Sequence, residues 1–272
     1  MFYNKNLLNI ITLNDLLYYT LSEGKSRLVE AVDAENRKLC VWGTALNNRI
    51  VVFAPHPDDA TLGCGGAIAK KVAEGLEVII FVITDGRYAF FKRLGICWEP
   101  SPEEVKRIRR AECIAASGVL GVPEKNVLFF DFEDGTLEEH EKEAEEKMVD
   151  AIKTYSPADY YFPFRRDCHP DHRATNRIVR RALRQLGHEG SYEYTVTHIF
   201  ARVGPSIERF LSLFKRDRVE VDVSGFVSIK EEAIEAYKSE MTIISHKQKE
   251  PLHTEIERFL KRKEVFYLSR RS

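Results

Sequence analysis

The sequence lacks a paired cysteine pattern, a long apolar run and an excess of charge of either sign. Its five cysteines include no Cys-x-x-Cys pair, which excludes a disulfide framework and a thiolate zinc knuckle and favours a reducing, cytoplasmic compartment. The most apolar N-terminal stretch, residues 7–21, is interrupted by polar side chains and has no basic flank. We therefore expect neither a signal peptide nor a membrane partner. Lys and Arg total 41 against 42 Asp and Glu, and this balance argues against a nucleic-acid partner.

The sequence does contain a regular alternation of predicted strands and helices. Short apolar, β-branched or aromatic runs predict buried strands at residues 50–54, 78–83, 127–130 and 159–162. Helical spacing and capping signals predict helices at residues 67–74, 101–117, 137–155 and 173–186. Strands that alternate with helices in this way are joined by right-handed crossovers. The predicted fold class is therefore α/β, a Rossmann-like three-layer fold with a mainly parallel sheet flanked by helices.

Residues 1–45 are predicted to form an N-terminal extension ahead of this alternation. Leu7, Leu8, Ile11 and Leu16 recur at helical spacing, so the extension is expected to be helical. It either packs on its own domain or forms a contact between subunits of a homo-oligomer. Residues 46–272 contain no repeat, low-complexity tract or linker, and we expect them to form a single domain.

Clusters of His and Asp follow the first and the fourth predicted strands. His56 and Asp59 lie three residues apart in a proline-stiffened turn after the first strand, and His172 follows the fourth. Because ligands bind beyond the carboxyl ends of the strands in a parallel sheet, these side chains can meet at one point. Two His and one carboxylate, with a position open to water, is the composition of a catalytic zinc site. The same set also suits ferrous iron. A pair of surface turns with capping aspartates is the alternative.

These motifs resemble those of the LmbE/PIG-L family of zinc-dependent N-acetyl-sugar deacetylases. The resemblance spans roughly residues 50 to 175. The matching residues, in the family's order, are Ala54-Pro55-His56-Pro57-Asp58-Asp59, Gly63-Cys64-Gly65-Gly66, Thr84-Asp85-Gly86, Arg109-Arg110-Ala111-Glu112, Asp131 and His169-Pro170-Asp171-His172. The sequence departs from the family at Ala60, where a Glu is usual, and at Glu240, where the family often has Gln. Neither departure removes a proposed ligand.

The resemblance implies a zinc site and a catalytic base. His56, Asp59 and His172 would bind Zn2+, which lowers the pKa of a bound water to about 7 and so provides a nucleophile at neutral pH. Asp58 would be the general base, because it lies next to a metal ligand without being one itself.

The resemblance also implies roles for four further residues. His169 would donate a hydrogen bond to the oxyanion of the hydrolysed amide, or act as general acid for the leaving amine. Asp171 would orient the His169 ring and favour its charged form. Arg109 and Asp131 match family positions that contact the substrate; a solvated helix charge and a strand-end cap are the respective alternatives.

The predicted activity is that of a metal-dependent N-deacetylase, a hydrolase of linear amide C–N bonds. Its substrate would be GlcNAc or a GlcNAc-containing small molecule. Diacetylchitobiose is favoured because Pro55, Ala60 and the run Arg165-Arg166-Asp167 look closest to the archaeal deacetylases that act on chitin fragments. A GlcNAc conjugate in thiol biosynthesis is the second candidate. A non-catalytic metal- or sugar-binding protein and an ordinary nucleotide-binding protein are the alternatives of other classes.

Two further histidines have no motif around them. His246 and His253 lie on a polar stretch at residues 245–254, which we interpret as a flexible surface loop. A lid over the site and a contact with a neighbouring subunit are the alternatives, and the second would fit the homo-oligomers that the family often forms.

Overall fold

The computed structural model of the chain describes residues 29–32, 38–41, 48–96, 98–157, 159–188, 191–196, 218–254 and 256–269. The helix predicted from the apolar spacing of residues 7–16 lies outside these ranges. Residues 1–48 and 49–272 form two separate compact units. Within the first unit, β1 (Val29–Val32) pairs antiparallel with β2 (Lys38–Val41).

The second unit is built on a seven-stranded sheet with the order β5-β4-β3-β6-β7-β9-β8. Strands β5, β4, β3, β6 and β7 run parallel, while β9 pairs antiparallel with both β7 and β8. The strands are β3 (Arg49–Ala54), β4 (Glu77–Thr84), β5 (Val127–Phe132), β6 (Asp159–Pro163), β7 (Tyr192–Tyr194), β8 (Arg218–Asp222) and β9 (Lys263–Leu268). The predicted α/β class with a mainly parallel sheet is confirmed.

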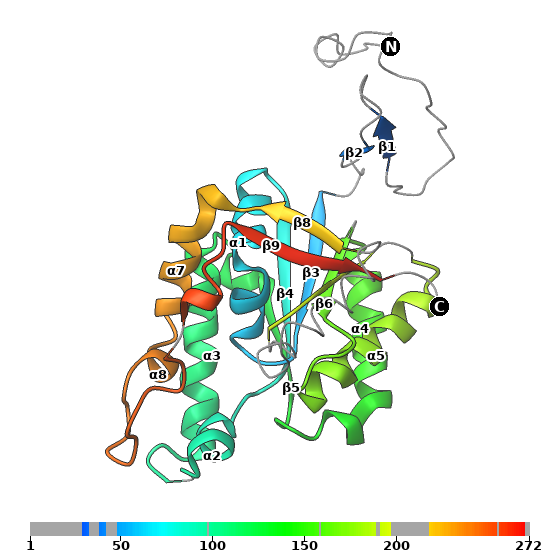
Figure 1. The fold of residues 1–272 in the computed structure, drawn as a ribbon. Coiled ribbons are helices and arrows are strands. Elements are labelled where there is room, and N and C mark those ends of the chain that lie inside the picture. The colour runs from blue at the N-terminus through cyan, green and yellow to red at the C-terminus, as the bar shows by residue number, and fades with distance from the viewer. Residues whose placement is uncertain are drawn as a thin grey trace, which may run out of the picture. The chain divides into compact units, whose positions relative to one another are not determined.

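Helices cover both faces of this sheet (Figure 1). One apolar cluster joins the sheet to α1, α3 and α7, and a second joins the opposite face to α4 and α5. The helices are α1 (Asp59–Ala73), α2 (Ala89–Leu94), α3 (Pro102–Val119), η2 (Glu124–Asn126), η3 (Leu137–His140), α4 (Glu141–Tyr155), α5 (Pro170–Gln185), η6 (Ser224–Phe226), α7 (Val227–Glu235), α8 (Lys238–Met241) and η7 (Ile256–Arg258). Among the residues described, no helix is both long and apolar enough to cross a membrane.

The central strands are buried on both faces, which explains their unbroken apolar sequences. In β3 the side chains of Val51 and Phe53 enter one cluster, while those of Ile50 and Val52 enter the other. Next to it, β6 pairs in the register Ile50↔Asp159, Val51↔Tyr160 and Val52↔Tyr161. Because each face of a parallel sheet is covered by helices, such strands need no polar alternation.

Two helices begin earlier than the sequence predicts. Helix α5 begins at Pro170, three residues before the predicted start, because proline suits the first helical position and the His169 side chain accepts the N–H of Asp171 there. Helix α1 begins at Asp59, eight residues early, and contains a non-helical residue at Cys64 (φ −145°, ψ 21°). Three nearby glycines make this first part resemble a turn in the sequence.

The second part of α1 has its own anionic cap. The carboxylate of Glu264, on β9, accepts the N–H groups of Gly66 and Ala67 at 2.9 and 2.8 Å, and a carboxylate at a helix N-terminus stabilises its unpaired N–H groups. A Cβ on Gly66 would lie 2.9 Å from Val223, so close packing explains this glycine. Strand β9 itself is not predicted, because a short strand with alternating burial gives a weak signal.

A partly buried carboxyl group at the start of β6 leads to a prediction about stability. Burial raises the pKa of Asp159 to about 6, against an opposing effect of the Lys71 charge. A raised folded-state pKa stabilises the fold below the unfolded value of 3.8, and this contribution is lost as the pH rises through about 6. We expect Asp159→Asn to raise the free energy of unfolding at pH 7.5 by at most about 3 kcal/mol.

Urea unfolding at pH 4 and pH 7.5 measures this effect. The variant should lose the part of the pH dependence that lies between about 4 and 6. The exposed helix residue Asp150 provides the control, since Asp150→Asn should leave the pH profile as in the wild type. An Asp159→Asn profile parallel to that of the wild type would contradict the prediction.

Candidate active site

The predicted site residues lie at the carboxyl edge of the sheet. From β3 the chain first adds β4 and β5 on one side and later β6 and β7 on the other. In such sheets, ligands bind beyond the carboxyl ends of the strands, at the point where the chain changes the side on which it adds new strands. The turn at residues 55–58 leaves β3, and the segment at residues 164–169 leaves its neighbour β6. Both segments therefore reach this point.

The three predicted metal ligands meet beyond the carboxyl ends of β3 and β6. His56 Nδ1 lies 3.0 Å from Asp59 Oδ2 and 3.2 Å from His172 Nε2, and the last two atoms are 3.1 Å apart. Zinc holds such ligands at about 2.0–2.2 Å in a tetrahedral arrangement, which places neighbouring ligand atoms roughly 3.3 Å from one another. The geometry and the chemistry of the donor set thus fit a zinc ion, and equally a ferrous ion.

The electrostatic surroundings of this point favour a positive charge. His56 Nε2 lies 3.2 Å from Asp171 and 3.5 Å from Asp134. Burial lowers the pKa of both His56 and His172, but the neighbouring carboxylates outweigh it. They raise the pKa of His56 well above its ordinary value and that of His172 to about 9. A divalent cation between these rings would supply the same positive charge.

Asp58 lies beside the metal point and carries a negative charge. Its Oδ1 is 2.9 Å from Arg109 Nη2, and its Oδ2 is 3.7 Å from His253 Nε2. Burial raises the pKa of Asp58, but the charges of Arg109 and His253 hold it well below its usual range. The carboxylate is therefore ionised at neutral pH, the form in which it can accept a proton.

The Arg109 side chain is directed at Asp58, and its other contacts lie within the protein. Its guanidinium contacts Glu240 at 2.6 Å and donates to the Gly86 carbonyl at 3.0 Å, and the residue is 4% exposed. The family resemblance implies a substrate contact at this position. The structure places Arg109 where it orients and stabilises Asp58.

His253 and Glu240 join the site beside Arg109 and Asp58, although neither is among the site residues predicted from the sequence. The His253 side chain is 10% exposed and lies 3.3 Å from Glu240, so the interpretation of residues 245–254 as a flexible surface loop is wrong for His253. It fits His246, whose side chain is 70% exposed. Burial lowers the pKa of His253, but Asp58 and Glu240 raise it to about 9. The imidazole is therefore protonated at neutral pH.

The His169 ring lies beside those of His56 and His172, with centroid distances of 4.6 and 5.2 Å. Its Nδ1 accepts the N–H of Asp171 at 3.2 Å, so the proton of the neutral ring lies on Nε2. Burial and the charges of His56 and His172 lower the pKa of His169 to about 4. The ring is neutral at pH 7, which suits an oxyanion donor and disfavours the general-acid role.

Asp171 contacts His56 more closely than His169, the ring it is predicted to orient. Its Oδ2 lies 3.2 Å from His56 Nε2 but 3.9 Å from His169 Nδ1. The same oxygen accepts the N–H of Gly135 at 2.7 Å, in a turn where the positive φ of +88° favours glycine. Asp171 therefore orients the predicted ligand His56.

Asp131, a predicted substrate contact, lies outside this cluster. It is exposed, and it pairs with Lys106 and Arg110 at 3.2 Å. The carboxylate that reaches His56 from this part of the chain is Asp134, which is 4% exposed. The sequence does mark Asp134, because Asp134-Gly135 is an Asp-Gly pair that closely follows a strand, as Asp85-Gly86 does after β4.

The family of the chain follows from two comparisons. Residues 51–183 match the family model described as PIG-L: GlcNAc-PI de-N-acetylase. This range contains both His-Pro-Asp motifs. A conserved protein of known structure from Thermus thermophilus is 30% identical, over 71% of this chain and 79% of that one, with a TM-score of 0.52. The chain belongs to the PIG-L family.

The relatives of this PIG-L protein include deacetylases. A diacetylchitobiose deacetylase from Thermococcus kodakarensis is 24% identical over 199 residues, 71% of this chain and 70% of that protein. A probable N-acetyl-α-D-glucosaminyl L-malate deacetylase from Bacillus cereus is 28% identical over 159 residues, 57% of this chain and 69% of that protein. The N,N'-diacetylchitobiose deacetylase structure from Pyrococcus horikoshii shares the fold, with a TM-score of 0.61 at 21% identity over 82% of this chain and 84% of that one. This PIG-L protein is an enzyme, a hydrolase of amide C–N bonds.

A second carboxylate lies behind the predicted ligand His172. Asp167 Oδ2 is 3.2 Å from His172 Nδ1, and Asp167 Oδ1 accepts the N–H of His169 at 2.9 Å. A carboxylate on the far nitrogen of a ligating histidine fixes the ring orientation and raises its basicity. In this PIG-L enzyme Asp167 therefore positions His172.

We expect Asp167→Asn to weaken metal binding about 10–100-fold while the fold persists, because the amide lacks the negative charge. Competition of the protein with a fluorescent zinc chelator measures the affinity, and circular dichroism verifies the fold. The matched control is Cys168→Ser in the adjacent, exposed position, which should keep the wild-type affinity. Equal zinc affinities of Asp167→Asn and the wild type would show that Asp167 does not act through His172.

Proposed function

We propose that this enzyme is a zinc-dependent deacetylase of GlcNAc or of a GlcNAc-containing small molecule, with diacetylchitobiose the favoured substrate. The observation that carries the proposal is the convergence of His56, Asp59 and His172 on one point beside the ionised Asp58. The named activities of the Thermococcus and Bacillus relatives support the substrate class.

In this proposal each site residue has a separate role in amide hydrolysis. A zinc ion held by the three ligands would polarise the acetamide carbonyl and acidify a water molecule. Asp58 accepts a proton from the attacking water, with its carboxylate fixed by Arg109. His169 donates from Nε2 to the carbonyl oxygen as negative charge develops on it. Asp58 then passes the proton to the leaving nitrogen, and the C–N bond breaks to give acetate and a free amine.

A metal-dependent assay for the released amine tests this proposal. The protein is stripped with EDTA, reconstituted with Zn2+ or Fe2+, and offered GlcNAc, diacetylchitobiose and GlcNAc–L-malate. We expect amine release that is absent without metal and is restored by zinc. Zinc binding without amine release from any compound would contradict the proposal and would support a non-catalytic binding protein instead.

A GlcNAc conjugate is the second candidate substrate, because the Bacillus relative is 28% identical and is named for the L-malate conjugate. The ratio of kcat/KM for diacetylchitobiose and GlcNAc–L-malate separates the two candidates. The preferred substrate is a small molecule in either case, and the reducing cytoplasm is the compartment that the cysteine pattern favours.

A further inference from the structure

Large apolar side chains are exposed in two segments of the described chain. They are Phe91 (53% exposed), Trp98 (70%), Ile243 (54%) and Ile244 (39%). The aromatic pair lies on α2 and on the connection that follows it, and the isoleucines follow α8. A single exposed apolar side chain is common on protein surfaces, so what it can bind depends on the groups beside it.

The helix that carries Phe91 is firmly anchored. Phe90, the preceding residue, is 1% exposed and packs with Ile96, Val105 and Leu252 in an apolar cluster of their own. Because neighbouring positions on a helix point in different directions, burial of Phe90 turns Phe91 outward. The exposure of Phe91 is thus a consequence of how α2 is held in place.

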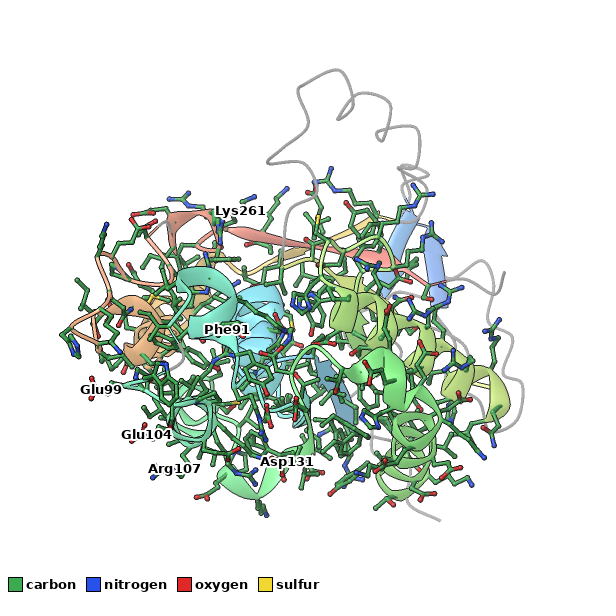
Figure 2. All side chains as sticks on the ribbon, turned by 90° about the horizontal axis from the view of Figure 1, so that it is seen from below. Phe91, Glu99, Glu104, Arg107, Asp131 and Lys261 are labelled. Carbon is green, nitrogen blue, oxygen red and sulfur yellow. The ribbon has the colours of Figure 1, made fainter. Side chains whose placement is uncertain are left out.

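The same helix borders the candidate active site. Tyr88 N–H and the Lys92 ammonium donate to the two oxygens of Asp134 at 3.1 and 2.7 Å. Asp134 in turn lies 3.5 Å from His56. Tyr88, Phe91 and Lys92 share one side of α2, and the rings of Tyr88 and Phe91 are 6.5 Å apart. Figure 2 shows Phe91 on α2, seen from below. The Asp134 carboxylate and the His56 ring therefore link this side of α2 to the point where the three predicted ligands meet.

We propose that α2 binds the sugar ring adjacent to the GlcNAc unit that is deacetylated, with Phe91 stacking on that ring. This inference rests on the proposed function and names the second sugar as the specificity element. A pyranose ring presents a face of C–H groups, whose positive edges suit the negative face of an aromatic ring. Its hydroxyls project around that face. A phenyl ring with hydrogen-bonding groups beside it therefore complements a sugar.

The groups around Phe91 fit a sugar better than a second copy of the chain. The Tyr88 hydroxyl donates to Glu133 at 3.1 Å, and both groups are solvent-accessible. Lys92 and Arg93 flank Phe91 in the sequence, and both are exposed. Charged side chains are depleted from the centres of protein–protein interfaces, whereas Glu and Lys side chains commonly accept and donate hydrogen bonds to hydroxyl groups.

The test compares two sugars on the zinc-loaded enzyme. We expect Phe91→Ala to lower the ratio of kcat/KM for diacetylchitobiose to kcat/KM for GlcNAc by about tenfold. Phe91→Tyr should retain the wild-type ratio because it keeps the ring face. Phe91→Leu should lower the ratio as Phe91→Ala does, because its side chain is apolar but has no ring. Trp98→Ala, at the other exposed aromatic, is the matched control and should keep the wild-type ratio.

Three results would overturn the inference. They are an unchanged ratio in Phe91→Ala, an equal loss in Trp98→Ala, and an altered oligomeric state of Phe91→Ala in gel filtration, which would assign Phe91 to a contact between copies. If the wild type releases amine from neither sugar, the proposed function fails, and this result does not test the stacking site. Calorimetry with diacetylchitobiose then decides: weaker binding by Phe91→Ala supports the stacking site, and equal or undetectable binding by the two proteins contradicts it.

Discussion

Asp58→Asn is expected to keep the metal and lose the reaction, with kcat falling about 10²–10⁴-fold. The amide has almost the same shape as the carboxylate, but it cannot accept the proton of the attacking water. His56, Asp59 and His172 are unchanged in the variant, so their convergence on the metal point should persist. Amine release under saturating substrate measures kcat, and elemental analysis of the same samples measures zinc.

The control for this variant is Asp131→Asn. Asp131 also matches a family motif position, but it is exposed and pairs with Lys106 and Arg110 outside the cluster. Its substitution should leave kcat within about threefold of the wild type, since the transition state loses no contact. If Asp58→Asn turned over at the wild-type rate, another group would have to take up the proton. If it lost zinc as well, Asp58 would belong to the metal site.

Glu264→Gln is expected to lower the free energy of unfolding by about 3–5 kcal/mol. The Lys230 ammonium lies 2.7 Å from Glu264 Oε1, and both side chains are at most 5% exposed. Removing the negative charge leaves the buried ammonium without its ion pair, and its remaining contact is the Leu62 carbonyl at 2.8 Å. The N–H groups of Gly66 and Ala67 also lose a charged acceptor. Urea unfolding of the zinc-loaded protein measures the change.

A neighbouring ion pair supplies the control. Glu220 pairs with Lys263 at 3.1 Å, but both side chains are well exposed, so Glu220→Gln should have little effect on stability. Adding Lys230→Met to Glu264→Gln should recover part of the lost stability, because the buried charge is then gone. Equal unfolding midpoints for Glu264→Gln and Glu220→Gln would mean that the buried pair contributes no more than the exposed one.

The sequence predicts those parts of the fold and of the site that are determined by residues close together in the chain. The continuous apolar runs of β3 and β4 identify strands buried on both faces, and these strands fix the sheet that positions the site. His56 lies in the turn after β3, while Asp59 and His172 lie in the first turns of α1 and α5, which follow β3 and β6. The fold class alone therefore indicates that these residues can meet. At the end of β5 the family match rests on one residue, Asp131, and is less informative. The structure brings Asp134 to His56 instead.

The residues that the sequence fails to predict act across long stretches of chain. Glu240 reaches Arg109 over 131 residues, and Glu264 reaches Gly66 over 198. Glu264 has no local pattern that distinguishes it from the solvated glutamates of this chain, and Glu240 stands out only as a departure from the family's usual residue. His253 is missed for the same reason, because its polar sequence neighbours indicate a surface loop. Only the packing of the last quarter of the chain against α1 and α3 gives these side chains their partners.

The pairing of β3 with β6 has a consequence for metal occupancy. His56 and Asp59 follow one of these strands and His172 follows the other, so the alignment Val51↔Tyr160 sets the separation of the ligands. A slip of one residue would shift the strands by about 3.3 Å, whereas metal–ligand distances tolerate only about 0.2 Å. Chains with misaligned strands could not retain the metal. Zinc content would therefore report the fraction of refolded protein in which β3 and β6 are correctly aligned.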